Sequence, residues 1–147
     1  MDMKLSDEQV QLRESACALL ENKCTAAFVR EMEKSEVGFS RDMWKEMAEL
    51  GWLGISLPEQ YGGLELCTVD QVILAKELGR YICPSPFLST AVIGAEALVR
   101  AGTAAQKQDF LPGIVEGETV VAFAFQEHSR DFDAGVIRLQ AREEGSD

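Results

Sequence analysis

The sequence predicts a mainly α-helical fold, a bundle of about six helices, followed by one or two β-strands of an incomplete β-domain. Apolar residues recur at helical spacing along most of the chain, in segments that begin at Ser or Thr and end at Gly. After Gly117 the pattern changes, because Thr119–Phe125 is a β-branched and aromatic run and Ile137–Arg142 alternates apolar with polar residues. We therefore expect a helical domain over residues 1–118 and the first strands of a truncated β-domain over residues 119–147.

The first two helices are predicted from their caps and apolar stripes. Ser6 is a good N-cap, and the acidic residues that follow it suit the positive end of the helix dipole. This helix is expected to run to Asn22. A second, shorter helix over Ala26–Glu33 is expected to bury Phe28 and Val29.

The next stretch predicts a helix, a buried connector and a shaped loop. Ser40 caps the helix, and Gly51 ends it because glycine adopts the left-handed conformation without a Cβ clash. The apolar segment Leu53–Leu57 is expected to be buried. Tyr61–Gly63 supplies the backbone freedom for a tight loop.

Three more helices are predicted in the second half of the chain. The apolar residues of Val69–Gly79 lie nearly all round the helix, which is typical of a central, largely buried element. The next helix begins at Pro86, where a missing N–H removes no hydrogen bond, and runs to Gly102. Thr103 opens the last helix with a capping box, and Pro112 is expected to break or restart it.

Composition limits the classes of function. A chain of 147 residues is long enough to bury one core, and an apolar fraction of 46% is ordinary for a soluble globular protein. No apolar run is long enough to span a bilayer, and the net charge of −11 argues against a nucleic acid or an anionic membrane surface as partner. The four cysteines Cys17, Cys24, Cys67 and Cys83 form no CxxC pair, which predicts buried, reduced thiols in a cytoplasmic protein.

Four segments carry a resemblance to a known family. The longest is WKEMAELGWLGISLPEQYGG, in which a helix ending in LGW runs into a Pro-Glu-x-Tyr-Gly-Gly loop. LSDEQ precedes it, and ILAKELGR and GTAAQKQDFLPGIVEGE follow it. In this order the segments resemble the N-terminal α-domain of the acyl-CoA dehydrogenase family.

The resemblance implies a reaction and its partners. Members of the family bind FAD, remove an α-hydrogen of an acyl-CoA as a proton with a glutamate, and pass the β-hydrogen to flavin N5 as hydride. That glutamate lies in the family's C-terminal domain, so no catalytic residue is expected here and the chain alone is expected to be inactive. An acyl-CoA substrate, an electron-transfer partner protein and a homo- or hetero-oligomer are also implied.

The resemblance implies cofactor contacts in the segment AFAFQEHSRDFD, at Phe125, Gln126 and Phe132. Gln126 stands where the family has Thr, and a Gln amide is able to bond a flavin carbonyl. Arg130 and Phe132 replace the small residues of the family pattern Thr-Glu-Pro-x-Ala-Gly-Ser-Asp. The altered loop is similar to that of the smaller subunit of some two-subunit bacterial enzymes.

Substrate contacts are implied at Phe87, Ser89 and Ile93, on the helix that faces the acyl pocket in the family. The alternative is that this apolar stripe is simply core. Arg130 suits bidentate contact with a phosphate, and the alternative is a surface ion pair with a neighbouring aspartate.

The remaining candidates have ordinary interpretations. Glu59 and Glu127 are carboxylates near the family motifs, and we expect them to be solvated or capping side chains. His128 is the only histidine and has no second ligand nearby, so no metal site is expected.

Two classes of function stay open from the sequence. The first is a flavin-dependent acyl-CoA dehydrogenase of which this chain is the N-terminal portion. The second is a non-catalytic subunit or helical interaction module, marked by the altered loop Gln126–Asp133, because a shared fold does not guarantee shared chemistry.

Overall fold

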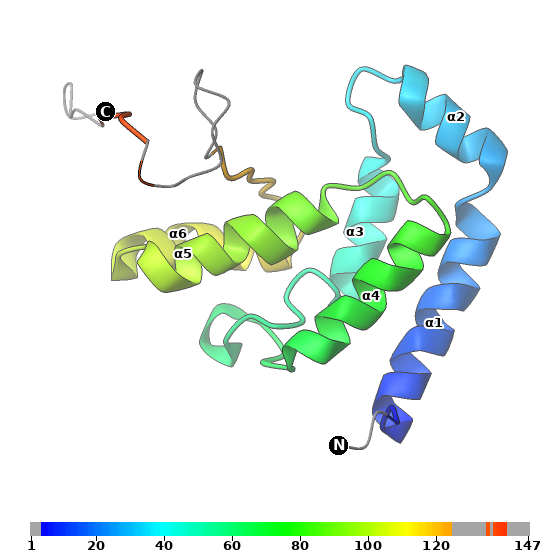
Figure 1. Cartoon of the computed structure of the whole chain (residues 1–147), viewed down its shortest axis with the longest axis horizontal. Coiled ribbons are helices and arrows are strands. Elements are labelled where there is room, and N and C mark those ends of the chain that lie inside the picture. Colours follow the sequence, from blue (N-terminus) through cyan, green and yellow to red (C-terminus); the bar gives the residue numbers. More distant parts are fainter. Residues whose placement is uncertain (1–3, 125–134, 136, 141–147) are drawn as a thin grey trace.

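The computed structural model describes residues 4–124, 135 and 137–140. In this part of the chain the fold is an assembly of helices, with α5 and α6 lying beside the group formed by α1 to α4 (Figure 1). None of the described helices combines the length and the apolar character that crossing a bilayer requires. The elements are α1 (Asp7–Lys23), α2 (Ala26–Lys34), α3 (Arg41–Glu49), the 3₁₀ turn η1 (Glu59–Tyr61), α4 (Thr68–Arg80), the π-helical segment η2 (Leu88–Gly94), α5 (Ala95–Ala101) and α6 (Ala104–Val115).

Side-chain caps set the helix boundaries. Ser6, Thr25, Ser40 and Thr103 each accept a hydrogen bond from the backbone N–H three residues further on, which satisfies a donor that the helix leaves unpaired. Gly51 follows α3 with a left-handed φ of +74°. The predicted caps at Ser6, Ser40 and Thr103 and the predicted stop at Gly51 are therefore confirmed.

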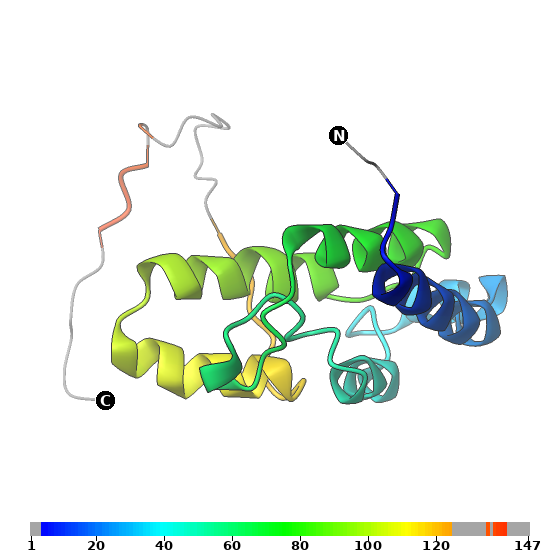
Figure 2. The same cartoon turned by 90° about the horizontal axis from the view of Figure 1, so that it is seen from below.

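The larger core lies where α1, α3 and α4 meet. Helices α1 and α4 lie side by side in both views (Figures 1 and 2). Ala16 and Leu20 of α1, Met47 of α3 and Leu74 of α4 are fully buried in one cluster. This packing fixes α4, whose C-terminal end leads into the candidate site.

A carboxylate is buried between α1 and α4. Glu77 is 1% exposed, and its Oε2 accepts a hydrogen bond from the Cys17 thiol at 3.2 Å. The same oxygen lies 3.6 Å from Nη1 of Arg80. Burial raises the pKa of the Cys17 thiol and the neighbouring Glu77 raises it further, so the thiol keeps the proton that it donates. The bond therefore ties α1 to α4.

A smaller core joins the connector after α3 to the pair α5 and α6. Leu57, Ala95, Leu111 and Ile114 are buried together in this cluster, and α6 packs against both η1 and α5 (Figure 2). The connector approaches itself closely here, because a Cβ on Gly63 would lie 2.0 Å from the carbonyl oxygen of Leu57. Glycine at this loop position is thus a steric requirement.

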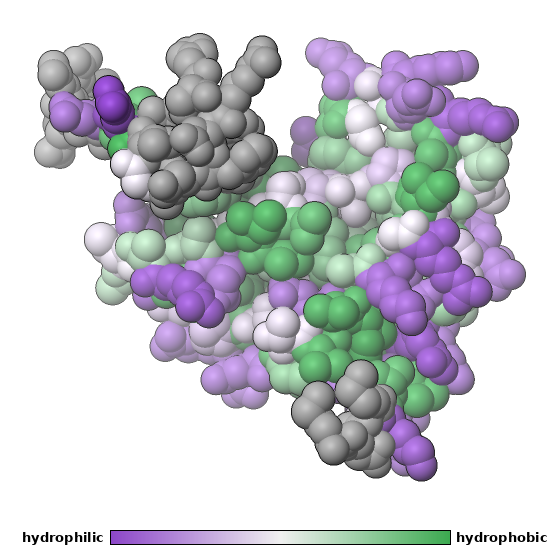
Figure 3. Space-filling view, in the orientation of Figure 1, coloured by the Kyte–Doolittle hydropathy of each residue, from purple (hydrophilic) through white to green (hydrophobic). Residues whose placement is uncertain are grey.

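Helix α4 is buried on one face only, which corrects the prediction of a helix buried nearly all round. Ile73, Leu74 and Leu78 are buried, whereas Val69 is 50% exposed and Val72 is 57% exposed. Figure 3 shows apolar surface over this helix. The apolar pattern indicates that these side chains favour burial, but it does not say which element covers each of them.

Three smaller predictions are also wrong. Phe28 and Val29 are only half-buried, because α2 lies at the periphery of the assembly (Figure 1). Helix α6 runs through Pro112 to Val115, since a proline this close to the helix end removes only one hydrogen bond. All four cysteines are free thiols, but Cys67 is exposed at the N-cap of α4 rather than buried.

No strand is present in the part of the chain that the structure describes, although strands are predicted over Thr119–Phe125 and Ile137–Arg142. A strand needs a neighbouring strand to satisfy its backbone groups. The backbone of Val121 bonds instead to the side chain of Thr90. Phe125 of the first predicted strand and residues 141–142 of the second lie outside the described ranges. The domain boundary after residue 118 stays a prediction.

Candidate functional site

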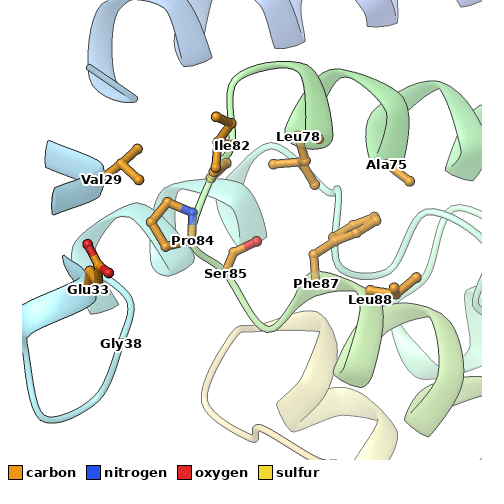
Figure 4. A pocket seen from close by; sticks show the side chains of 12 residues that line it. Val29, Glu33, Gly38, Ala75, Leu78, Ile82, Pro84, Ser85, Phe87 and Leu88 are labelled. Carbon is orange, nitrogen blue, oxygen red and sulfur yellow. The ribbon is translucent and has the colours of Figure 1, made fainter. Parts of the chain in front are cut away.

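An apolar pocket of about 520 Å³ lies between α2, the C-terminal half of α4 and the start of η2 (Figure 4). Glu33 of α2 adds a carboxylate to its wall. The apolar side chains around it are Val29, Ala75, Leu78, Ile82, Phe87 and Leu88. Such a lining suits the hydrocarbon part of a ligand.

The chain between α4 and η2 forms one wall of this pocket. The N–H of Ile82 donates to the carbonyl of Gly79 at 3.1 Å, and the N–H of Cys83 donates to the carbonyl of Leu78 at 2.9 Å. Ile82 has a φ of +52°, a conformation that is rare for a β-branched residue, and its side chain is 71% exposed. The helix end therefore fixes the turn that brings Phe87 into the pocket.

The three predicted substrate contacts on this helix have different surroundings. Phe87 is 2% exposed and lines the pocket. The Oγ of Ser89 donates to the carbonyl of Pro86 at 3.1 Å, so this hydroxyl is engaged within its own helical turn. Ile93 is 46% exposed and is not among the residues that line the pocket. The structure thus places Phe87 at the pocket, and Ser89 and Ile93 further along the same segment.

One side chain of α4 joins this helix both to the π-helical segment η2 and to the connector after α3. Gln71 of α4 donates from Nε2 to the carbonyl of Ala91 at 3.3 Å and to Oγ of Ser56 at 3.0 Å. π-Helical turns are rare and frequently lie at functional sites. Gln71 is not predicted as a site residue, since one polar residue among the several on this helix gives only a weak signal.

Thr90 of η2 is fully buried and binds the backbone of Val121 in both directions. Its Oγ1 donates to the carbonyl oxygen of Val121 at 2.8 Å and accepts the N–H of the same residue at 3.2 Å. The segment that leaves α6 is therefore fixed to η2 shortly before Phe125, the first predicted flavin contact. A lone threonine in an apolar stripe gives no functional signal, so the sequence does not predict this role.

Two helix glycines allow that segment to approach. A Cβ on Gly94 would lie 2.5 Å from Cγ2 of Val121, and a Cβ on Gly113 would lie 2.5 Å from Oγ1 of Thr119. The N–H of Thr119 also donates to the carbonyl of Gly113 at 2.9 Å. A second cavity, of about 400 Å³, lies between α5, α6 and this segment and reaches Phe123. Glycines inside predicted helices are the sequence signal for such a close approach.

The predicted cofactor and phosphate contacts Phe125, Gln126, Phe132 and Arg130 lie outside the described residues, as do the other polar residues of their loop. Those assignments stay predictions. Glu59 is exposed at the start of η1. Among the described residues, no group of three or more His, Cys, Asp or Glu side chains is placed to hold a metal ion.

A family model agrees with this architecture. The model of the acyl-CoA dehydrogenase N-terminal domain matches residues 6–118. The mitochondrial isovaleryl-CoA dehydrogenase of Pongo abelii is 32% identical over 145 residues, which cover 97% of this chain and 34% of that protein. The chain spans about a third of the length of the curated relatives that it matches.

Solved structures show the same fold. An acyl-CoA dehydrogenase from Bacillus anthracis, complexed with FAD, superposes with a TM-score of 0.78 at 28% identity, over 90% of this chain and 22% of that one. A chain of the ChsE4-ChsE5 complex from Mycobacterium tuberculosis gives a TM-score of 0.76 at 27% identity, over 83% of this chain and 34% of that one. The chain therefore belongs to the acyl-CoA dehydrogenase family, within which it corresponds to the N-terminal helical domain.

Proposed function

We propose that this chain is the N-terminal helical portion of a flavin-dependent acyl-CoA dehydrogenase, an enzyme that introduces an α,β double bond into an acyl-CoA thioester. The observation that carries the proposal is the match of the family's N-terminal domain to residues 6–118. FAD is the proposed cofactor, because the similar Bacillus anthracis enzyme is complexed with it. When bound, FAD would supply the acceptor for the hydride, and the proton would go to a base outside these residues.

The described residues fit a supporting part in cofactor binding. Thr90 holds the backbone of Val121 through two hydrogen bonds, and Gly94 leaves room for the Val121 side chain. Val121 lies just before Phe125 and Gln126, which we propose as flavin contacts together with Phe132. In this arrangement η2 sets where the flavin-contacting segment begins.

The acyl chain is proposed to lie along η2. Phe87 contributes to the apolar pocket at one end of this segment, and Ile93 presents an exposed apolar side chain further along it. Ser89 and Arg130 complete the proposed substrate contacts, with Arg130 facing a phosphate of the CoA moiety. Apolar side chains that this chain leaves exposed are expected to be covered by a ligand or by another domain.

The experiment uses the full-length protein that contains this chain. We expect it to purify yellow, with flavin near stoichiometric, and to lose its visible absorbance when a suitable acyl-CoA is added without oxygen. A colourless protein that takes up no FAD would contradict the proposal. The ChsE4-ChsE5 complex suggests repeating a negative result with co-purified partner subunits before the enzyme assignment is abandoned.

A matched pair of variants tests the acyl contacts. Ile93→Asp places a charge on η2, whereas Val37→Asp places one at a similarly exposed apolar position in the loop after α2. We expect Ile93→Asp to raise the KM for a medium-chain acyl-CoA by roughly 10-fold or more, because a hydrocarbon contact is replaced by a charge. Val37→Asp should leave the KM unchanged. Equal KM values for both variants would remove Ile93 from the proposed pocket.

A second candidate is a non-catalytic subunit of a two-subunit enzyme, favoured by the replacement of small family residues with Arg130 and Phe132. In that case flavin would appear only once per pair of different subunits, bound mainly by the partner.

We also propose an electron-transfer protein as redox partner and a cytoplasmic location, the latter because all four cysteines are free thiols.

A further inference from the structure

Three sulfur atoms from three elements meet at the edge of the larger core. Cys24 is the C-cap of α1, Met43 lies in the first turn of α3, and Cys83 lies in the connector after α4. The Sγ of Cys24 is 3.8 Å from Sδ of Met43, and the Sγ of Cys83 is 4.0 Å from the same atom. Cys24 and Cys83 thus share one neighbour, the thioether sulfur of Met43. The three elements therefore bring two thiols within 4.0 Å of one thioether sulfur.

The three sulfur-bearing residues differ in burial and in access to the pocket. Cys24 is 8% exposed and Met43 is 5% exposed, so two of the sulfurs lie inside the protein. Cys83 is half-buried and lines the apolar pocket of Figure 4, to which Glu33 contributes a carboxylate. Cys83 is therefore the sulfur-bearing residue of the three that borders the pocket.

We propose that Cys24, Cys83 and Met43 form a three-sulfur site that binds one soft monovalent metal ion, Cu(I) or Ag(I). At a metal–sulfur distance of about 2.3 Å, three donors in a plane around one ion lie roughly 4 Å apart. The two separations from Met43 Sδ, 3.8 and 4.0 Å, are close to that spacing. Both thiols therefore already lie near the distance from Met43 that three-coordinate binding requires.

The donor set selects the class of ion. Thiolate and thioether sulfurs favour Cu(I) among the biological metals, whereas Mg²⁺ and Ca²⁺ require oxygen ligands. A structural zinc site takes four ligands, usually cysteine and histidine, and a thioether is not one of them. The negative net charge of −11 further favours the approach of cations over anions.

The thiols are protonated when the site holds no metal. Burial raises the pKa of Cys83 to about 12, with the neighbouring Cys24 adding to the effect, and burial also raises the pKa of Cys24. When both sulfurs coordinate as thiolates, one cation enters, two protons leave, and no electron is transferred. The S–H bonds are replaced by two metal–thiolate bonds and one thioether bond, which only a strongly thiophilic ion is able to sustain.

The test uses the 147-residue chain with the two other cysteines changed to serine. Cys17→Ser keeps a hydroxyl donor for Glu77, and Cys67→Ser places a favoured N-cap residue at the start of α4. This background should bind one equivalent of Cu(I), supplied with a non-thiol reductant and measured by competition against a chromophoric Cu(I) chelator. Native mass spectrometry gives the stoichiometry, and Zn²⁺ at the same concentration should not bind.

Three further changes in this background distinguish the site from chance thiol binding. We expect Cys24→Ser and Cys83→Ser to abolish binding at one equivalent. Met43→Leu conserves side-chain volume and should keep the fold, as followed by circular dichroism, while weakening Cu(I) binding at least about 10-fold. Absence of binding by the background protein would overturn the proposal. Unchanged affinity in folded Met43→Leu would do so as well, because the site would then lack its third ligand.

Discussion

Thr90 links the helical core to the segment that follows it through one hydroxyl group. It bonds to both backbone groups of Val121, which pair with no strand among the residues that the structure describes. Leaving a buried polar group unsatisfied is more destabilising than the mean worth of a hydrogen bond suggests. Thr90 is therefore expected to contribute to the free energy of unfolding as well as to the proposed flavin site.

The variant Thr90→Val conserves shape and removes the hydroxyl. We expect the free energy of unfolding to fall by about 1–3 kcal/mol, because the carbonyl and N–H of Val121 lose their partner. Urea denaturation measures this change, and hydrogen exchange at the Val121 amide should accelerate. Thr90→Ser keeps the hydroxyl and serves as the control. If Thr90→Val were as stable as Thr90→Ser, the two bonds would have no energetic importance.

Gly94 and Gly79 provide a matched test of close packing. A Cβ on Gly94 would lie 2.5 Å from Val121 Cγ2 and 3.0 Å from the carbonyl of Ser89, whereas a Cβ on Gly79 would meet no atom within 4 Å. We expect Gly94→Ala to lower the melting temperature. Gly79→Ala should stabilise the protein by roughly 0.5–1 kcal/mol, as alanine does inside a helix. A similar effect of both changes, measured by calorimetry, would contradict the packing argument.

Helix starts were predictable from the sequence because their causes are local. Ser6, Ser40 and Thr103 cap helices through contacts with residues three positions away, so the pattern and the structure coincide. The covered side of α4 was not predictable, since Val72 is exposed only as a result of how distant elements pack. The bond from Thr90 to Val121 likewise joins residues far apart in sequence, and no local pattern announces it.

The first turn of α4 contains a carboxylate whose titration should affect stability. Oδ2 of Asp70 accepts from both the N–H and the thiol of Cys67, each at 3.0 Å. Burial pushes the pKa of this carboxyl upward, but the hydrogen bonds from Cys67, Gln9 and the helix backbone together outweigh it and leave the pKa below its usual value. The ionised form is therefore favoured in the folded state.

The sign of the pH effect follows from that lowered pKa. The contribution of Asp70 is complete above the unfolded pKa of about 3.9 and is lost as the pH falls through the folded value. We expect the stability difference between the wild type and Asp70→Asn to shrink as the pH falls from neutral to about 3. Urea denaturation at several pH values measures it. A difference that stays constant across this range would show that Asp70 does not titrate differently on folding.

Across the whole molecule, apolar surface remains on the elements that surround the candidate site. Val69 and Val72 of α4 and Leu88 and Ile93 of η2 are all exposed by 46% or more. Figure 3 shows such surface over α4 and toward the middle of the molecule. Monomeric proteins rarely leave large contiguous apolar patches open, so these faces are expected to associate with other protein surface.

The last prediction is that the 147-residue chain, expressed by itself, associates with further copies of itself. Burying one exposed Val, Leu or Ile contributes roughly 1.5–3 kcal/mol, so a few such side chains are enough to hold a dimer. Light scattering after size-exclusion chromatography should give a mass that rises with concentration. The double change Val72→Gln and Leu88→Gln should restore the monomer, because it replaces apolar contacts with solvated amides. Val37→Gln removes an exposed valine from the loop after α2 and should leave the association unchanged. A monomeric mass at every concentration would show that the faces of α4 and η2 do not drive assembly.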